Sequence, residues 1–172
     1  MQFANPNILF LVVLFLHIGG AVVAFGPTFA FPLIGAAGGR EPQHAGFAVR
    51  ATQLISTRLV GPVALWVGAT GVLLIVLSGR SPGELWLSVS ILLYVLALAF
   101  SLLVAAPNTA KLVEATNTPP PAPPAGAAPG APPPSGPPPH IAALVAKAQR
   151  NGMILGLFVI VILALMVLKP TL

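Results

Sequence analysis

Four long runs of apolar residues, separated by polar or proline-rich segments, set the hydrophobic pattern of this chain. The first run, from Ile8 to Phe25, reads ILFLVVLFLHIGGAVVAF and contains no charged side chain. As a helix it would extend for roughly 27 Å, close to the roughly 30 Å thickness of a hydrocarbon core. Backbone polar groups in lipid must be paired within the segment, so the run predicts a membrane-spanning helix.

Three further runs have the same character and complete a pattern of four spans. Proline is expected to mark helix ends, because its ring removes a backbone N–H and clashes with the preceding turn. We therefore expect Pro107 to end the third helix, and Pro27 and Pro32 to kink or end the first. The predicted spans after the first lie at about residues 59–78, 85–106 and 153–168.

The connections differ in length and chemistry. Residues 40–57 are amphipathic but too polar to span, which predicts a short interfacial helix leading into the second span. Residues 81–84, Ser-Pro-Gly-Glu, are typical of a turn. Residues 140–149 resume a helical pattern and are predicted to continue into the last span.

Residues 118–139 hold most of the chain's 20 prolines, interleaved with alanine and glycine. Such a composition cannot bury enough apolar surface to fold, so we expect a disordered loop of polyproline II character. A spacer is the simpler interpretation, and a ligand for aromatic-groove domains is the alternative. The predicted fold is thus a single all-α membrane domain, residues 1–172, with a proline-rich loop between its third and fourth helices.

Composition agrees with this fold class. The 172 residues are 56% hydrophobic and only 6% charged, with a mean hydropathy of +0.95. Soluble domains carry about 25% charged residues, so a soluble fold is excluded. The net charge of +5 comes from basic residues scattered between apolar runs, which favours lipid and not nucleic acid as the partner. With no cysteine, disulfides and thiolate chemistry are excluded.

The distribution of Lys and Arg predicts an orientation. Few basic residues flank the spans on the side of the termini, where only Arg80 and Lys169 are found. The other side carries most of them. The positive-inside rule therefore places the two longer connections and the proline-rich loop in the cytoplasm, and both termini outside. The basic residues of the predicted cytoplasmic side are Arg40, Arg50, Arg58, Lys111, Lys147 and Arg150.

Small and polar residues recur at helical spacing within three of the spans. Such faces allow helices to approach closely in a membrane, where packing and not hydrophobicity drives association. We expect these faces to turn inward and to supply the interhelical contacts. The candidate positions are His17 and Gly20 in the first span, Gly61, Gly68 and Gly71 in the second, and Ser90, Tyr94 and Ser101 in the third.

His17 is the candidate for chemistry, because an ionisable side chain near the middle of a span is costly and tends to serve a function. His17, Trp66 and Tyr94 lie at one predicted depth, which predicts a hydrogen bond between the imidazole and the phenol; Trp66 is expected to face lipid or bulk. The alternatives for His17 are an interhelical hydrogen bond to Tyr94, Ser90 or Ser101, a haem or metal ligand, and a proton or substrate relay. No catalytic residue and no metal-binding set is predicted, since every glutamate lies in a connection.

Three segments carry a resemblance to a family of bacterial integral membrane proteins of unknown function: FLHIGGAVVAFG, residues 58–62, and the closing LALMVLKP. The resemblance covers most of the chain outside the proline-rich loop and implies a multi-pass cell-membrane protein. More distantly, a histidine in the first of four helices is similar to the copper-resistance D-like and HemJ-like protoporphyrinogen oxidase proteins. That similarity implies haem as a cofactor of His17 alone.

These observations lead to three functional hypotheses. The first is a non-catalytic structural or accessory membrane subunit, which forms a homo-oligomer or joins other membrane subunits through its glycine-rich faces. The second is a haem-binding redox protein that uses His17. The third is a small solute or ion carrier, which broken helices would favour.

Overall fold

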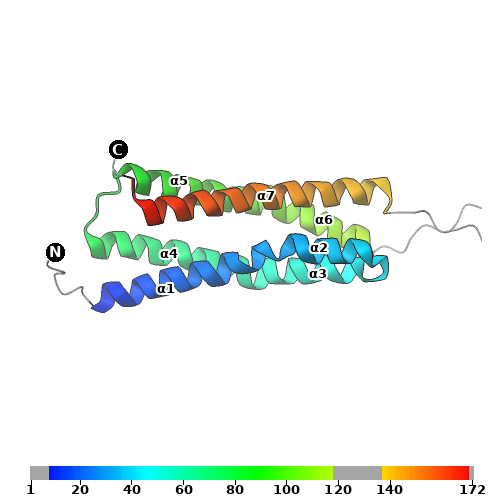
Figure 1. Cartoon of the computed structure of the whole chain (residues 1–172), viewed down its shortest axis with the longest axis horizontal. Helices are drawn as coiled ribbons and strands as arrows, with labels where there is room; N and C mark the ends of the chain where they lie inside the picture. Colours follow the sequence, from blue (N-terminus) through cyan, green and yellow to red (C-terminus); the bar gives the residue numbers. More distant parts are fainter. Residues whose placement is uncertain (1–7, 118–136, 171–172) are drawn as a thin grey trace, which may run out of the picture.

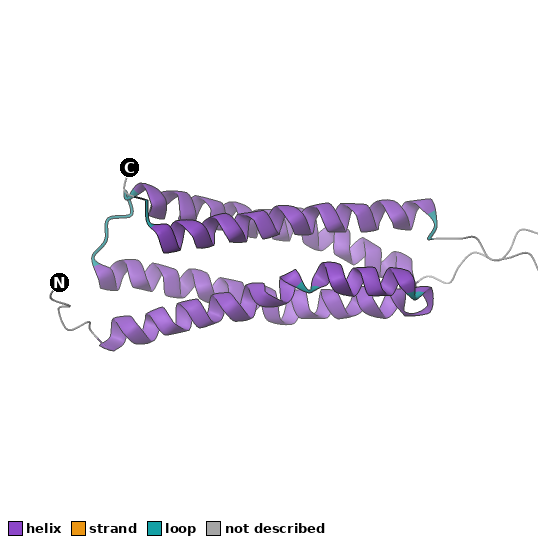
Figure 2. Cartoon of the chain, viewed as in Figure 1, coloured by secondary structure: helices purple, strands orange, loops and turns teal. Residues whose placement is uncertain are grey.

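The computed structural model describes residues 8–117 and 137–170, and within them every regular element is helical. Four of the resulting helices are long and apolar enough to cross a membrane. They run antiparallel to their chain neighbours, so that Ile8, the turn after Ser78 and Leu168 lie at one end (Figure 1, Figure 2). The predicted all-α four-helix architecture is therefore confirmed. The long helices are Ile8–Arg40, Ala45–Ser78, Leu85–Asn117 and Pro139–Leu168.

The first long helix bends at its prolines but does not end there. α1 (Ile8–Phe25) passes through a 3₁₀ turn, η1 (Gly26–Phe29), into α2 (Phe31–Arg40). Pro27 lies in the first positions of η1, where a backbone N–H would have no partner within the helix, so its missing N–H costs no hydrogen bond. The hydroxyl of Thr28 donates to the Phe25 carbonyl over 2.6 Å and supports the turn. Of the two outcomes expected at the prolines, the kink is the one that occurs.

The second long helix corrects the expectation of a separate interfacial helix. After the short turn η2 (Pro42–His44), α3 (Ala45–Ile55) continues through a π turn, η3 (Ser56–Val60), into α4 (Gly61–Ser78). The whole helix is 34 residues long. In the π turn the Gly61 N–H bonds the Ser56 carbonyl, five residues back. The widened turn accommodates the ring of Pro62, which would clash with the carbonyl four residues back in an α-helix.

The third long helix corrects a second expectation, because it does not end at Pro107. α5 (Leu85–Phe100) leads into another π turn, η4 (Ser101–Ala105), and α6 (Ala106–Asn117) follows without a break. The Ala106 N–H bonds the Ser101 carbonyl, again five residues back. Pro107 is thus placed as Pro62 is, at the second position after a π turn.

The fourth long helix is unbroken, as the pattern of residues 140–149 predicted. α7 (Pro139–Leu168) is 30 residues long. Of the predicted proline-rich loop, residues 118–136 lie outside the described residues, and Pro139 is the first residue of α7.

Packing differs between the two halves of the bundle. In the half that contains the termini, α1 packs against α4 and α5 packs against α7; in the other half α3 packs against both α2 and α6, and α6 packs against α7. Close approach depends on glycine. A methyl group on Gly20 would lie 3.1 Å from Val67 Cγ2, and one on Gly38 would lie 2.9 Å from the Ala48 methyl.

The outer surface of the bundle is apolar over the uncharged stretches of its helices, and basic residues lie at the ends of two of these stretches. Large side chains such as Phe15 and Leu103 are about three-quarters exposed, at 74% and 76%. The uncharged stretches between Arg58 and Arg80, and between Arg150 and Lys169, each extend for roughly 30 Å, which matches a hydrocarbon core. The other charged side chains of the described helices lie in α2, α3, α6 and the first half of α7, at the end of the bundle opposite Ile8.

Trp86 closes the end of the bundle that contains the α4–α5 turn. Its indole lies 5.9 Å from both the Arg80 guanidinium and the Lys169 amine, measured to the ring centroid. Its Nε1 donates to Glu84 Oε2 over 2.8 Å. These contacts link the ends of α4, α5 and α7 at the depth where aromatic side chains favour a membrane interface.

Candidate functional site

His17 contacts the backbone of α4 from α1. Its Nδ1 lies 3.0 Å from the Val67 carbonyl oxygen and 3.1 Å from the Thr70 hydroxyl. A carbonyl only accepts, so Nδ1 carries the proton and donates it to Val67. Among the described residues no hydrogen bond reaches Nε2, whose lone pair stays unshared. The ring is half-buried and points toward α4.

Thr70 completes this contact. The side chain is buried, and its hydroxyl lies 2.9 Å from the Trp66 carbonyl and 3.0 Å from the Val67 carbonyl of its own helix. Because the hydroxyl donates to one of these carbonyls, its oxygen can accept from the imidazole. Gly71 provides the space, since a methyl group there would lie 3.2 Å from His17 Cε1.

Tyr94 reaches the same helix from α5. Its hydroxyl donates to the Ala64 carbonyl over 3.0 Å. A methyl group on Gly68 would overlap the phenol and lie 2.9 Å from Tyr94 Cζ, so only glycine allows this approach. The small residues of α4 therefore receive a polar ring from α1 and another from α5.

The expected hydrogen bond between imidazole and phenol does not form. His17 comes from α1 and Tyr94 from α5, and each bonds a different backbone carbonyl of α4, that of Val67 or that of Ala64. Gly68 and Gly71 of α4 thus lie next to two separate rings, that of Tyr94 and that of His17.

The remaining candidate residues make no hydrogen bond to His17 among the described contacts. Ser90 is almost fully buried, at 1% exposure, and donates to the Trp86 carbonyl of its own helix. Ser101 begins η4, and Gly61 follows η3. A methyl group on Gly20 would lie 3.2 Å from Trp66 Cδ1, and Trp66 is half-exposed.

Sequence reasoning did not single out Thr70 or the two buried asparagines. Thr70 had a visible signal, as a hydroxyl within an apolar run. Asn108 in α6 is buried and donates to the Leu144 carbonyl of α7 over 3.2 Å. Asn151 in α7 is 3% exposed, and its Nδ2 has no hydrogen-bond partner among the described residues. Both lie in a segment that was assigned to a connection, so their polarity gave no signal.

The site offers donors and acceptors but no acid–base pair. Within residues 8–117 and 137–170, no three His, Asp or Glu side chains are grouped so that they could hold a metal ion. His44 pairs with Glu41 over 2.8 Å at the exposed tip between α2 and α3, far along the bundle from His17.

A family model described as "predicted integral membrane protein (DUF2269)" matches residues 11–170. A search of curated proteins and a search of solved structures gave no significant match.

Proposed function

The chain belongs to the DUF2269 family of predicted integral membrane proteins, and from this premise we propose that it is a non-catalytic accessory or structural subunit. In this proposal it lies in the inner membrane of a bacterium as a multi-pass protein. Its apolar outer faces contact lipid and either a second copy or other membrane subunits.

One observation carries the proposal: the polar rings of the membrane half are engaged with the backbone of α4. His17 donates to Val67, and Tyr94 donates to Ala64. Interhelical hydrogen bonds of this kind contribute about 0.6 kcal/mol on average in membranes and fix how helices pack. Groups used in this way hold the bundle together, and none of them is paired with a carboxylate for general acid–base chemistry.

The proposed orientation follows the charge. The basic residues of α2, α3, α6 and early α7 lie at the end of the bundle opposite Ile8. The positive-inside rule supports a cytoplasmic location for this end and for the proline-rich loop. The termini would then face outward.

The absence of cysteine allows a direct test of assembly. Single cysteines would be placed at exposed apolar positions on different helices, at Phe15, Val76, Leu103 and Leu163, and oxidised in native membranes. A subunit that assembles through one face gives efficient cross-links from that face only, to itself or to one reproducible partner. Equal, weak cross-linking from all four positions would refute the assembly proposal.

A second candidate, a haem-binding redox protein, is favoured by the tautomer of His17. Metal-bound histidines commonly donate their other ring N–H to a carbonyl, which is how Nδ1 of His17 meets Val67. Nε2 of His17 would hold the iron, and haem would supply one-electron transfer. The visible spectrum of the purified protein tests this, since a Soret band lost in His17→Ala would support haem and a colourless preparation would reject it.

A further inference from the structure

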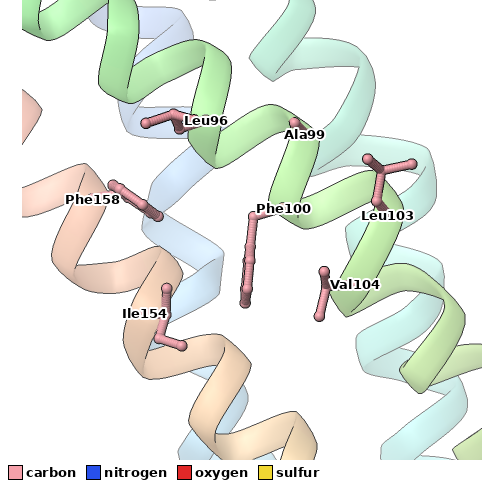
Figure 3. Close-up of a pocket in the computed structure, with 7 residues that line it drawn as sticks. All are labelled: Leu96, Ala99, Phe100, Leu103, Val104, Ile154 and Phe158. Carbon is pink, nitrogen blue, oxygen red and sulfur yellow. The ribbon is translucent and has the colours of Figure 1, made fainter.

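The start of α5 and the end of α7 carry polar contacts that the middle of this helix pair lacks. In the middle, α5 and α7 form a groove lined only by apolar side chains, which offers no polar group to a ligand (Figure 3). At the end of the bundle that holds the α4–α5 turn, Arg80, Glu84 and Lys169 surround the indole of Trp86. We refer to these four residues as the Trp86 cluster.

The Trp86 cluster holds one more positive charge than negative charge. Glu84 Oε2 accepts from Trp86 Nε1 over 2.8 Å and from Arg80 Nη1 over 3.1 Å, so this carboxylate balances the charge of Arg80. Lys169 has no acidic partner among the described residues. The other two glutamates, Glu41 and Glu114, lie at the opposite end of the bundle. One positive charge of the cluster is therefore left without a counter-charge in the described chain.

The two cations gather at one ring. The Arg80 guanidinium and the Lys169 amine each lie 5.9 Å from the centroid of Trp86, whose side chain is only 8% exposed. About 12 Å at most therefore separates them, which is comparable to the Debye length of about 10 Å at 0.1 M ionic strength. The ring attracts both cations but carries no net charge. An anion at this place interacts favourably with both of them.

The backbone of Lys169 is strained where it brings the amine to the ring. Lys169 ends α7 at φ 42° and ψ 58°, and it is the only non-glycine residue of positive φ in the described chain. Glycine is the usual residue in this left-handed conformation at a helix end. Pro170 adds to the cost, because the residue before a proline favours extended backbone. Strain of this kind is concentrated at functional sites, which directs attention to the lysine side chain.

The Trp86 cluster lies at the depth of lipid phosphates. Arg80 ends the uncharged stretch of the second long helix, and Lys169 ends that of the fourth. Both residues are exposed. Aromatic side chains favour the membrane interface, and cations at the ends of spans direct their charge to it. The two cations are thus accessible both to lipid head groups and to ions from the water.

We propose that Arg80 and Lys169 bind a phosphate group, and that Trp86 and Glu84 are the positioning residues for the two cations. Of the guanidinium donors of Arg80, only Nη1 is engaged within the described chain, so the others can bond a second oxyanion. A phosphate offers several acceptor oxygens and can accept from the guanidinium and the amine together. The phosphate is supplied either by the head group of a membrane lipid or by a soluble phosphate anion. The site does not depend on the accessory-subunit proposal, because no helix face that would contact a second subunit takes part in it.

Lipid titration of the full chain tests the phosphate site. The purified protein would be delipidated in detergent and titrated with dioleoylphosphatidylglycerol, and bound lipid counted by native mass spectrometry. Dioleoylglycerol has the same acyl chains without the phosphate and is the matched lipid control. Inorganic phosphate added to the lipid complex distinguishes the two sources, since displacement identifies the soluble anion as a ligand and its failure identifies the lipid head group.

Variants of the cations and of the ring separate this site from general attraction to charge. Lys169→Gln removes the unbalanced charge, and Lys169→Arg restores it. Arg150→Gln removes the cation at the other end of the uncharged stretch of α7, which makes no cation–π contact in the described chain, and is the matched control. Trp86→Leu keeps both charges and removes the ring that positions them.

We expect one tightly bound phosphatidylglycerol and no tight binding of dioleoylglycerol. Lys169→Gln should lower the affinity about fivefold to tenfold, as loss of one charge-assisted hydrogen bond at an exposed site predicts. Lys169→Arg and Arg150→Gln should keep the affinity, and Trp86→Leu should lower it although both charges remain. Equal binding of the two lipids would overturn the proposal, as would equal losses in Lys169→Gln and Arg150→Gln. An unchanged affinity in Trp86→Leu would overturn the positioning role of the ring.

A second measurement uses the wild-type protein and so covers variants that do not fold. The chain has three lysines, Lys111, Lys147 and Lys169, which an amine-reactive ester labels at rates that peptide mass spectrometry can follow. Phosphatidylglycerol should slow the labelling of Lys169, relative to dioleoylglycerol, and leave Lys111 and Lys147 unchanged. Equal slowing at the three lysines, or no slowing at Lys169, refutes the site.

Discussion

The replacement of Gly68 by alanine is the most informative single change in the bundle. The added methyl group would overlap the Tyr94 hydroxyl and lie 2.9 Å from Cζ and 3.1 Å from Cε1 of the same ring. The phenol must therefore move away from α4. It then loses its 3.0 Å hydrogen bond to the Ala64 carbonyl. One methyl group on α4 thus weakens the contact between Tyr94 of α5 and the backbone of α4.

The change in the free energy of unfolding is the balance of two destabilising effects and one stabilising effect. Overpacking costs about 1–3 kcal/mol, and the lost interhelical hydrogen bond costs about 0.6 kcal/mol. The better helix propensity of alanine returns at most about 1 kcal/mol. We expect Gly68→Ala to lower the free energy of unfolding by about 1–3 kcal/mol.

Gly156→Ala is the matched control. Gly156 lies in α7, and a methyl group there would meet no atom within 4 Å. Only the propensity gain remains, so this variant should be neutral or more stable by up to about 1 kcal/mol. A third variant, Tyr94→Leu, removes the ring; Gly68→Ala made in that background should cost less than in the wild type, which identifies Tyr94 as the residue displaced.

Unfolding of the full chain by sodium dodecyl sulfate in mild detergent, followed by the fluorescence of its two tryptophans, measures these differences. Equal stability of Gly68→Ala and Gly156→Ala would contradict the predicted clash with Tyr94. An unchanged cost of Gly68→Ala in the Tyr94→Leu background would contradict it as well.

Three further predictions address other parts of the bundle. Gly38→Ala places its methyl group 2.9 Å from the Ala48 methyl group, so α2 and α3 must move apart. Amide hydrogen exchange in α2 and α3 should accelerate, as a loss of about 1–2 kcal/mol in local stability predicts, and exchange in α7 should change little. Thr70→Val removes the hydroxyl beside the imidazole and should lower the free energy of unfolding by about 0.6 kcal/mol, because Nδ1 keeps its carbonyl; a loss above about 2 kcal/mol would show that the hydroxyl is the main partner. An impermeant maleimide should label Ser81→Cys in intact cells and Gln43→Cys only after permeabilisation, and the reverse result would invert the proposed orientation.

The hydrophobic pattern located the four helices well because lipid imposes a single requirement on every span. The limits of the helices were harder to predict. Pro107 and the polar segment before Thr57 suggested ends, yet both helices continue, because a π turn precedes Pro62 and Pro107 and removes the clash. A π turn depends on one altered backbone hydrogen bond, and this leaves no trace in a pattern of apolar and polar residues.

The sequence predicted only a part of the candidate site's geometry, for a related reason. Spacing along a helix places His17 on the face with Gly20, and Tyr94 on the face with Ser90. It does not tell which neighbouring helix each face meets. That choice depends on how the helices pack around α4, and it gave His17 a carbonyl and Thr70 in place of Tyr94.

The role of His17 as an interhelical donor can be tested on the ring itself. Solid-state ¹⁵N spectroscopy of the histidine-labelled protein in lipid bilayers, with the signal assigned by its loss in His17→Ala, reports which ring nitrogen carries the proton. We predict a neutral imidazole with the proton on Nδ1 and an unperturbed Nε2. A proton on Nε2, or an Nε2 signal displaced by bound iron, would contradict the structural role proposed for this residue.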